Sequence, residues 1–469
     1  MRGPGPGRTV STIGRDLSKP IMVLAGLAYL SGLAVALIWM RLSPLIILML
    51  TVGGIALLVM TLRPIVAVHA FIMLLNVENL VSTKQGFTGM KALGAIILVG
   101  WLLSMAARRK IAVQWNTLVM AALLFVTWCA VSLLYAFDSE LALSRLFTYV
   151  QLTTAMVMFH SVVDDGPKLR AVLWSIVLWV LLSTVVALAE YYTGLTRVAV
   201  GLAGNRNLLV VYIGIGTVCA TMLYMETDRV VPKLFLASAL PVFFLGLALT
   251  MSRAGLIAQI VALLVVWYRI AREKGFLILT LSVALLCVIA LVLPDAFWKR
   301  AGTIVPSIKR QENTFGVRVR LWKVGWRMIE DRPVTGVGPG NFMAAFPHYG
   351  PGELVSKKLV THNAYVGVAA EQGLVGAVLF LALHLIALRE ARRAIRAGEE
   401  GASRELRCFA VAAEAGILVI MVNALTLNSE IFKILWMLFG LAMSLGHMAQ
   451  RVIKEQEVRA GLNPVRVTP

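Results

Sequence analysis

Apolar residues fill almost the whole chain in continuous runs of about 20 residues, the length that an α-helix needs to cross the hydrocarbon core of a bilayer. The runs do not alternate between apolar and polar positions, and this favours helices over the strands of a membrane barrel. We expect about twelve membrane-spanning helices, although hydropathy allows about fourteen. The runs are residues 20–40, 42–62, 64–80, 90–107, 116–136, 142–163, 170–192, 207–225, 232–251, 254–271, 275–293, 363–388, 407–427 and 430–449.

The basic residues of the short connecting segments indicate the orientation. With the N-terminus inside, most of them fall on the same side, as in the groups around Arg109 and Arg272. Short basic loops stay in the cytoplasm, whereas a long loop crosses largely regardless of its charge. We therefore expect both termini to be cytoplasmic and the long segment 294–362 to face outside.

This orientation divides the chain into five segments. They are a disordered cytoplasmic tail at 1–19, the N-terminal transmembrane helices at 20–293, the long outside loop at 294–362, the C-terminal transmembrane helices at 363–449 and a cytoplasmic tail at 450–469. The long loop is the part expected to carry the chemistry, because the polar motifs gather in it and beside it.

The composition agrees with an all-α polytopic membrane protein. Hydrophobic residues make up 59% of the chain and charged residues 14%, against about a quarter in a soluble domain. The net charge of +20 lies mainly at the membrane edges, where orientation and anionic headgroups explain it. No nucleic-acid-binding module is recognisable, so nucleic acid is not expected as a partner. The four cysteines have no disulfide or metal spacing, and no metal site is expected.

An amphipathic helix is predicted within the long loop, at about 315–330. Val319, Trp322, Trp326 and Ile329 recur every three to four residues. This helix could lie on the membrane surface, and its basic side either is solvated or contacts a phosphorylated lipid. The basic residues on that side are Arg318, Arg320, Lys323 and Arg327.

A glycine-rich stretch follows this helix. Gly336, Gly338 and Gly340 permit tight turns with positive φ. The stretch lacks the Lys-Ser/Thr pair of a phosphate-binding P-loop. It therefore predicts a shaped turn, and no ATP is expected.

His362 ends the long loop, directly before the span that begins at 363. The start of a helix disfavours a charged imidazolium and favours a neutral ring that can act as a base. Glu371 lies half a turn out of phase on the same predicted helix, so it cannot pair with His362. His362 is thus a candidate general base without a carboxylate partner on its own helix.

Two arginines occur at other boundaries on the same outside face. Arg206 lies in the stretch Gly204-Asn-Arg-Asn207, and Arg253 lies in Met251-Ser-Arg-Ala-Gly255. The planar guanidinium suits phosphate oxygens. The outside face therefore combines a histidine with arginines from three segments, a pattern that favours phosphate binding.

These segments, in this order, resemble the O-antigen ligase and polymerase superfamily. The resemblance is carried by Ser-Arg-Ala-Gly at 252–255, the stretch from Arg320 to Phe342, and His-Asn-Ala-Tyr at 362–365 with Glu-Gln-Gly at 371–373. It implies a glycosyltransferase of the Gram-negative bacterial inner membrane, commonly with about twelve spans. The implied architecture is that of enzymes with lipid-linked donors (GT-C-like), with a periplasmic active site.

The resemblance implies an inverting O-antigen ligase that needs no cofactor, ATP or metal. Its donor would be O-antigen on undecaprenyl diphosphate and its acceptor lipid A–core oligosaccharide, with membrane lipids around it. His362 matches the general base, and the diphosphate-binding residues would be Arg206, Arg253, Arg318 and Arg320. Supporting roles are expected for Asn363, Tyr365, Glu371, Gly338 and Gly340.

Alternative functions stay open. An O-antigen polymerase or a protein O-oligosaccharyltransferase would share these motifs, although the short tail after the last span favours a ligase. A membrane transporter is the alternative from another class. A transporter would place polar or broken helices at mid-membrane in paired halves, whereas the polar motifs here gather at one face.

Overall fold

The computed structural model describes residues 44–75, 89–107, 115–270, 314–350, 360–401 and 403–459. They fall into two compact units, one formed by Met1–Ala67 and Lys91–Ile111 and the other by Val68–Met90 and Ala112–Pro469. The tail predicted at 1–19, the spans predicted at 20–40 and 275–293, and the start of the long loop lie outside the described residues.

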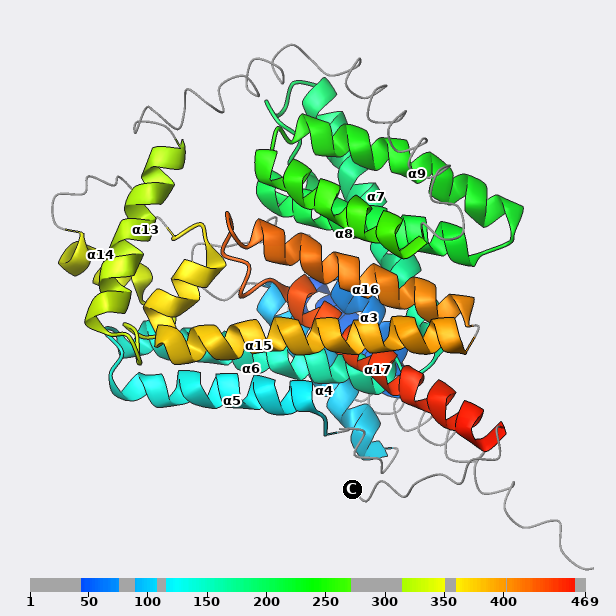
Figure 1. Cartoon of the computed structure of the whole chain (residues 1–469), viewed down its shortest axis with the longest axis horizontal. Helices are drawn as coiled ribbons and strands as arrows, with labels where there is room; N and C mark the ends of the chain where they lie inside the picture. Colours follow the sequence, from blue (N-terminus) through cyan, green and yellow to red (C-terminus); the bar gives the residue numbers. More distant parts are fainter. Residues whose placement is uncertain are drawn as a thin grey trace, which may run out of the picture. The chain divides into compact units, whose positions relative to one another are not determined.

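The smaller unit contains α2 (Pro44–Leu62), the start of α3 (Pro64–Leu74) and most of α4 (Gly89–Ala107) (Figure 1). α3 begins at Pro64. Proline lacks a backbone N–H, and at the first position of a helix that N–H would have no hydrogen-bond partner within the helix. α4 approaches α2 closely, because a Cβ atom at Gly100 would lie 3.0 Å from Met60 Cβ. Helices are therefore present where the apolar runs 42–62 and 90–107 predicted them.

Helices also account for the first part of the larger unit. Four of them begin at an asparagine or aspartate whose side chain accepts a backbone N–H of the first turn, a common way to start a helix. The helices are α5 (Thr117–Val131), α6 (Ser139–Val162), α7 (Gly166–Tyr192), α8 (Arg206–Glu226), α9 (Val230–Leu249) and a further helix at Arg253–Ile270.

Three helices complete the larger unit: α15 (Ala364–Glu400), α16 (Arg404–Asn423) and α17 (Lys433–Arg459). α15 packs against α5, α16 and α17, and α16 packs against α8 (Figure 1). α15 continues beyond the predicted end at 388, because the following residues are mostly Ala, Arg and Glu, which favour helix without being apolar.

The amphipathic helix predicted in the long loop is present as α13 (Thr314–Asp331), and a short helix α14 (Phe342–Tyr349) follows. The side that packs against α15 differs in part from the predicted apolar side, because Ile329 is buried as predicted but Trp326 is not. Leu321, Val324 and Met328 are buried, whereas Trp326 is 59% exposed. The predicted and the buried residues both recur with helical spacing. Gly325 lies on the side that contacts α15, because a Cβ atom there would lie 2.8 Å from Val366.

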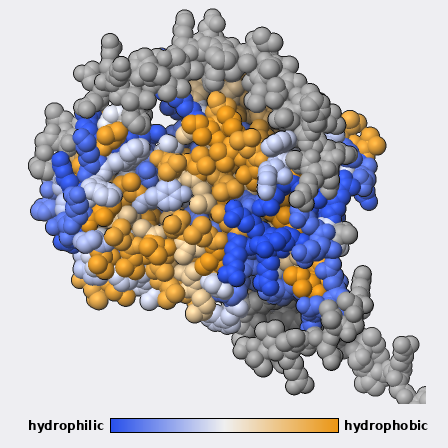
Figure 2. All heavy atoms as spheres, in the orientation of Figure 1, coloured by the Kyte–Doolittle hydropathy of each residue, from blue (hydrophilic) through white to orange (hydrophobic). Residues whose placement is uncertain are grey.

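Seven helices of the described residues are long and apolar enough to cross a membrane, from α5 to α9 together with Arg253–Ile270 and α15. No strand occurs among these residues. On the face shown in Figure 2, apolar side chains gather over the middle and polar ones towards the left and right. The surface of α15 changes in the same way along the helix. Its middle exposes the apolar Val378 and Leu385, and arginines follow from Arg389 onwards. In the part that the structure describes, the chain is therefore a helical protein of the polytopic membrane type.

Candidate functional site

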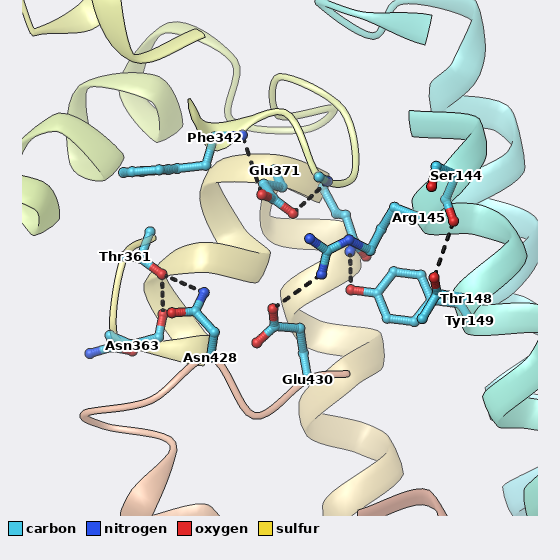
Figure 3. A network of polar contacts seen from close by, with 12 residues as sticks. Ser144, Arg145, Thr148, Tyr149, Phe342, Thr361, Asn363, Glu371, Asn428 and Glu430 are labelled. Atoms are coloured by element: carbon cyan, nitrogen blue, oxygen red, sulfur yellow. Dashed lines mark hydrogen bonds and ion pairs between the residues drawn. The ribbon is translucent and has the colours of Figure 1, made fainter. Parts of the chain in front are cut away.

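His362 lies in the short segment before α15, in a backbone conformation that few residues adopt. Its φ is +49°, in the left-handed region that non-glycine residues seldom occupy. Asn428 fixes this conformation, because its Oδ1 accepts the His362 N–H at 2.7 Å. Asn428 Nδ2 also donates to Thr361 Oγ1 at 2.9 Å, and the Thr361 hydroxyl donates to the carbonyl of Asn363 at 3.0 Å (Figure 3).

Asn363 places His362 at the start of a helix, as predicted. The Asn363 side chain accepts the N–H groups of Tyr365 and Val366 at 3.0 and 3.1 Å, and so caps α15. The Tyr365 hydroxyl donates to the carbonyl of Met421 at 3.0 Å, which ties the same turn to α16. Asn363 and Tyr365 therefore hold the segment that carries His362.

The His362 ring is half-buried and makes no hydrogen bond with any residue that the structure describes. Burial lowers the pKa of His362, and the neighbouring Arg318 guanidinium lowers it further. The neutral ring expected at a helix start is thus favoured chiefly by desolvation and a nearby cation. Such a ring can accept a proton.

Arg318 of α13 lies near this histidine, and Arg206 at the start of α8 lies near Arg318. Burial lowers the pKa of Arg318, and the positive charge of Arg206 adds to the effect. Arg318 forms no ion pair with a carboxylate of the described chain. Arg318 therefore links an imidazole and a second guanidinium that come from two other segments of the chain.

Arg253 begins the helix next to α8. The preceding Ser252 hydroxyl lies 3.4 Å from the Asn207 side-chain oxygen, and Gly255 packs directly on Val210. The two arginine motifs are thus neighbours at the same end of their helices.

Arg320 lies two residues beyond Arg318 on α13. Two residues turn an α-helix by about 200°, so the two side chains leave α13 in nearly opposite directions. Arg318 is the one that affects the pKa of His362.

The glycine-rich stretch is a shaped turn held by α15. Gly336, Gly338 and Gly340 have φ values of +66°, +101° and +77°, as their sequence positions predicted. The Glu371 carboxylate accepts the N–H of Gly340 at 2.7 Å and that of Phe342 at 3.2 Å (Figure 3). Glu371 therefore organises this turn, consistent with the prediction that it does not pair with His362.

Gly373 bends α15 next to the same turn. Its φ of +68° and ψ of −176° interrupt the helix, and the N–H of Leu374 donates to the carbonyl of Pro333 at 2.7 Å. A Cβ atom at Gly373 would clash with the carbonyl oxygen of Val334. The Glu-Gln-Gly motif at 371–373 thus has a structural explanation.

The other side of the turn is fixed to the corner between α5 and α6. Asn341 Oδ1 accepts the N–H of Asp138 at 2.7 Å, and Asn341 Nδ2 donates to the Asp138 carbonyl at 3.0 Å. The N–H of Phe137 also donates to the carbonyl of Val337 at 2.9 Å. The turn is therefore held on two sides.

Sequence reasoning missed a buried pair close to this region. Arg145 of α6 forms a 3.7 Å ion pair with Glu430, which lies before α17 (Figure 3). Both residues occur at the start of predicted spans, where charge is costly, and that position was the available signal.

The site contains no cluster that resembles a metal centre: no group of three or more His, Cys, Asp or Glu side chains among the described residues is arranged to hold an ion. The charged side chain that acts on His362 is the Arg318 guanidinium, and the charge that acts on Arg318 is Arg206. This arrangement suits an anionic ligand.

The fold and site define a polytopic helical membrane protein with a cationic region beside a histidine at one end of its helices. Residues 236–381 match the family model described as O-antigen ligase, and they include Arg253, α13, the glycine-rich turn, His362 and Glu371. This segment, about a third of the chain, is thus similar to the O-antigen ligase superfamily, whose members are glycosyl-transferring enzymes. No match was found among curated proteins.

Proposed function

We propose that this protein is an O-antigen ligase. It transfers O-antigen polysaccharide from undecaprenyl diphosphate to lipid A–core oligosaccharide on the periplasmic face of the bacterial inner membrane. The long loop 294–362 is the periplasmic catalytic segment in this proposal, and both termini are cytoplasmic. The observation that carries it is the half-buried His362 near Arg318, both within the segment that matches the O-antigen ligase family, with Arg206 near Arg318.

His362 acts as the general base. A neutral imidazole takes the proton of the acceptor hydroxyl while that oxygen attacks the anomeric carbon of the donor. The bond from this carbon to the diphosphate oxygen breaks, and a single displacement inverts the anomeric centre. The lowered pKa of His362 supports this role, because it keeps the ring neutral at the pH of the reaction.

The arginines hold the diphosphate. Negative charge grows on this group as it leaves, and fixed cations stabilise that charge most in the transition state. Arg206 and Arg318 lie next to each other without a carboxylate partner for Arg318 among the described residues. A diphosphate between them would relieve their mutual repulsion, and Arg253 completes the proposed set; Arg320, on the other side of α13, is left out of it.

The donor is already activated by its diphosphate leaving group. The proposed reaction therefore needs neither nucleotide nor metal. Glu371, Gly338 and Gly340 support the site indirectly, because they form the turn that connects α13 to α14.

The test uses purified protein with an undecaprenyl-diphosphate-linked glycan and lipid A–core, with EDTA and without nucleotide. Glycan attached to lipid A–core is the expected product. Longer lipid-linked chains without attachment would instead identify a polymerase, and glycan on a protein acceptor an oligosaccharyltransferase. A well-folded protein that transfers glycan to none of these acceptors would contradict the proposal.

A further inference from the structure

A surface pocket of about 430 Å³ lies where α7, α8 and α9 meet. It is remote from His362, because α8 begins at Arg206 and runs for 21 residues, about 30 Å, to Glu226 at the pocket. The volume falls within the range of small-ligand sites. Its wall includes Arg170, Trp174, Glu226, Asp228, Arg229 and Pro232.

The pocket lies at a membrane boundary. α8 and α9 are each long and apolar enough to span a bilayer, and residues 227–229 connect them. The first residues of α9 present apolar side chains beside the pocket: Val230, Val231 and Leu234 are 67%, 78% and 66% exposed. A ligand bound here would therefore have a polar end in the pocket and an apolar surface next to it.

The wall combines both signs of charge. Glu226 accepts hydrogen bonds from Arg170 at 2.6 and 3.3 Å. Asp228 accepts from Arg404 at 3.1 and 3.2 Å and lies 3.8 Å from the Lys233 ammonium. Each carboxylate offers about four lone-pair positions, so both retain capacity for a further donor. An ammonium group fits this part of the wall.

Two hydrogen-bond donors of the wall have no partner within the described chain. The exposed Arg229 guanidinium makes no hydrogen bond or ion pair there, and the same is true of the Trp174 indole N–H. The Trp174 ring packs against Phe235, with centroids 5.8 Å apart, and is thereby held in place. These donors fit phosphate oxygens.

We propose that this pocket binds the headgroup of a zwitterionic aminophospholipid, with its phosphate on Arg229 and Trp174 and its primary ammonium on Glu226 and Asp228. The acyl chains then lie along Val231 and Leu234. An anionic headgroup without an amine offers no ammonium to the two carboxylates and so leaves that part of the wall unused. A choline headgroup has no N–H to donate to them, so a phosphatidylethanolamine headgroup fits best.

The test is native mass spectrometry of the full chain in detergent, titrated separately with phosphatidylethanolamine, phosphatidylcholine and phosphatidylglycerol. Phosphatidylethanolamine is expected to bind most tightly. Arg229→Ala should weaken phosphatidylethanolamine and phosphatidylcholine alike by roughly tenfold, because it removes a charge-assisted phosphate contact. Asp228→Asn should weaken phosphatidylethanolamine alone, since it is the only one of the three headgroups with an N–H group that can donate to that carboxylate.

Arg197→Ala is the matched control, because Arg197 is an exposed arginine beyond the opposite end of α7. It should leave all three affinities unchanged. Three results would each overturn the proposal: equal binding of the three lipids, tightest binding of phosphatidylglycerol, or equal effects of Arg229→Ala and Arg197→Ala. Circular dichroism and gel filtration of every variant exclude misfolding as the cause.

Discussion

At the residue scale, the geometry around His362 makes the proposed chemistry testable by pH. Burial and Arg318 both lower the pKa of His362 from its ordinary value of 6.5. A base works in its neutral form, so the rate should rise as pH increases through this lowered pKa and stay level above it. The acidic limb of the profile therefore reports on the ring and its surroundings.

Arg318→Gln should move this acidic limb to higher pH, because removal of a nearby cation stabilises the imidazolium. The measurement is kcat against pH at saturating donor, which separates the effect from weaker donor binding. In Arg320→Gln, the matched control on the other side of α13, the limb should keep its midpoint. A limb that stays fixed or moves to lower pH in Arg318→Gln would contradict the role given to Arg318.

Asn428 is expected to act as a positioning residue, because its side chain holds the unusual backbone of His362. Asn428→Ala should reduce kcat by about tenfold to a hundredfold, the range expected when a reacting group is displaced by about 1 Å. Donor affinity should change much less. Asn428→Asp keeps the acceptor for the His362 N–H and should restore part of kcat; a merely structural role would give no such rescue.

At the scale of elements, the bend in α15 and the glycine-rich turn form one structure. Glu371 accepts two N–H groups of the turn, and Gly373 gives the helix the bend that brings Pro333 to Leu374. α13 packs on the same part of α15 through Leu321, so helix and turn are fixed together.

Gly373→Ala should destabilise the protein by more than about 2 kcal/mol. The left-handed conformation alone costs an alanine about 1–2 kcal/mol, and the new methyl group would clash with Val334. Gly194→Ala is the matched control, because Gly194 has a φ of +77° but nothing within 4 Å of an added Cβ. Thermal unfolding in detergent should show a clearly larger loss for Gly373→Ala; equal losses would refute the clash.

The face of α13 that packs against α15 can be tested in the same way. Leu321 is fully buried, so Leu321→Ala should cost about 2–5 kcal/mol. Trp326 is 59% exposed, and Trp326→Ala should change stability by no more than about 0.5 kcal/mol. Protease resistance of the loop, measured beside thermal unfolding, checks both. A greater loss of stability in Trp326→Ala than in Leu321→Ala would mean that the side of α13 with Trp326 is the one that packs against α15.

At the scale of the whole molecule, local sequence patterns predicted the helices well, whereas contacts between residues far apart in the sequence could not be predicted. The apolar runs predicted the described helices, and the helix start at Asn363 placed His362 correctly. Three glycines predicted positive φ, because glycine adopts it without steric cost. Most of the packing face of α13 was not predicted. Two sets of apolar residues on this helix recur with helical spacing, and only the contact with α15 shows which set is buried.

Arg145, Asn428 and Glu430 were missed for another reason. Arg145 and Glu430 come from opposite halves of the chain and belong to none of the motifs. Asn428 acts on His362 through a backbone N–H, so its own sequence neighbourhood gives no sign of the role. Such contacts depend on how α6, α15 and α17 pack together, which spacing along one helix does not encode.

The most direct test of the account compares His362→Ala with Arg206→Gln in steady-state transfer and in donor binding. His362→Ala should bind the undecaprenyl-diphosphate donor like the wild type but lose kcat by at least about a hundredfold, the contribution of a general base. Arg206→Gln should instead weaken donor binding. If His362→Ala retains wild-type kcat, or if it loses only donor affinity, His362 is not the base and the central claim is wrong.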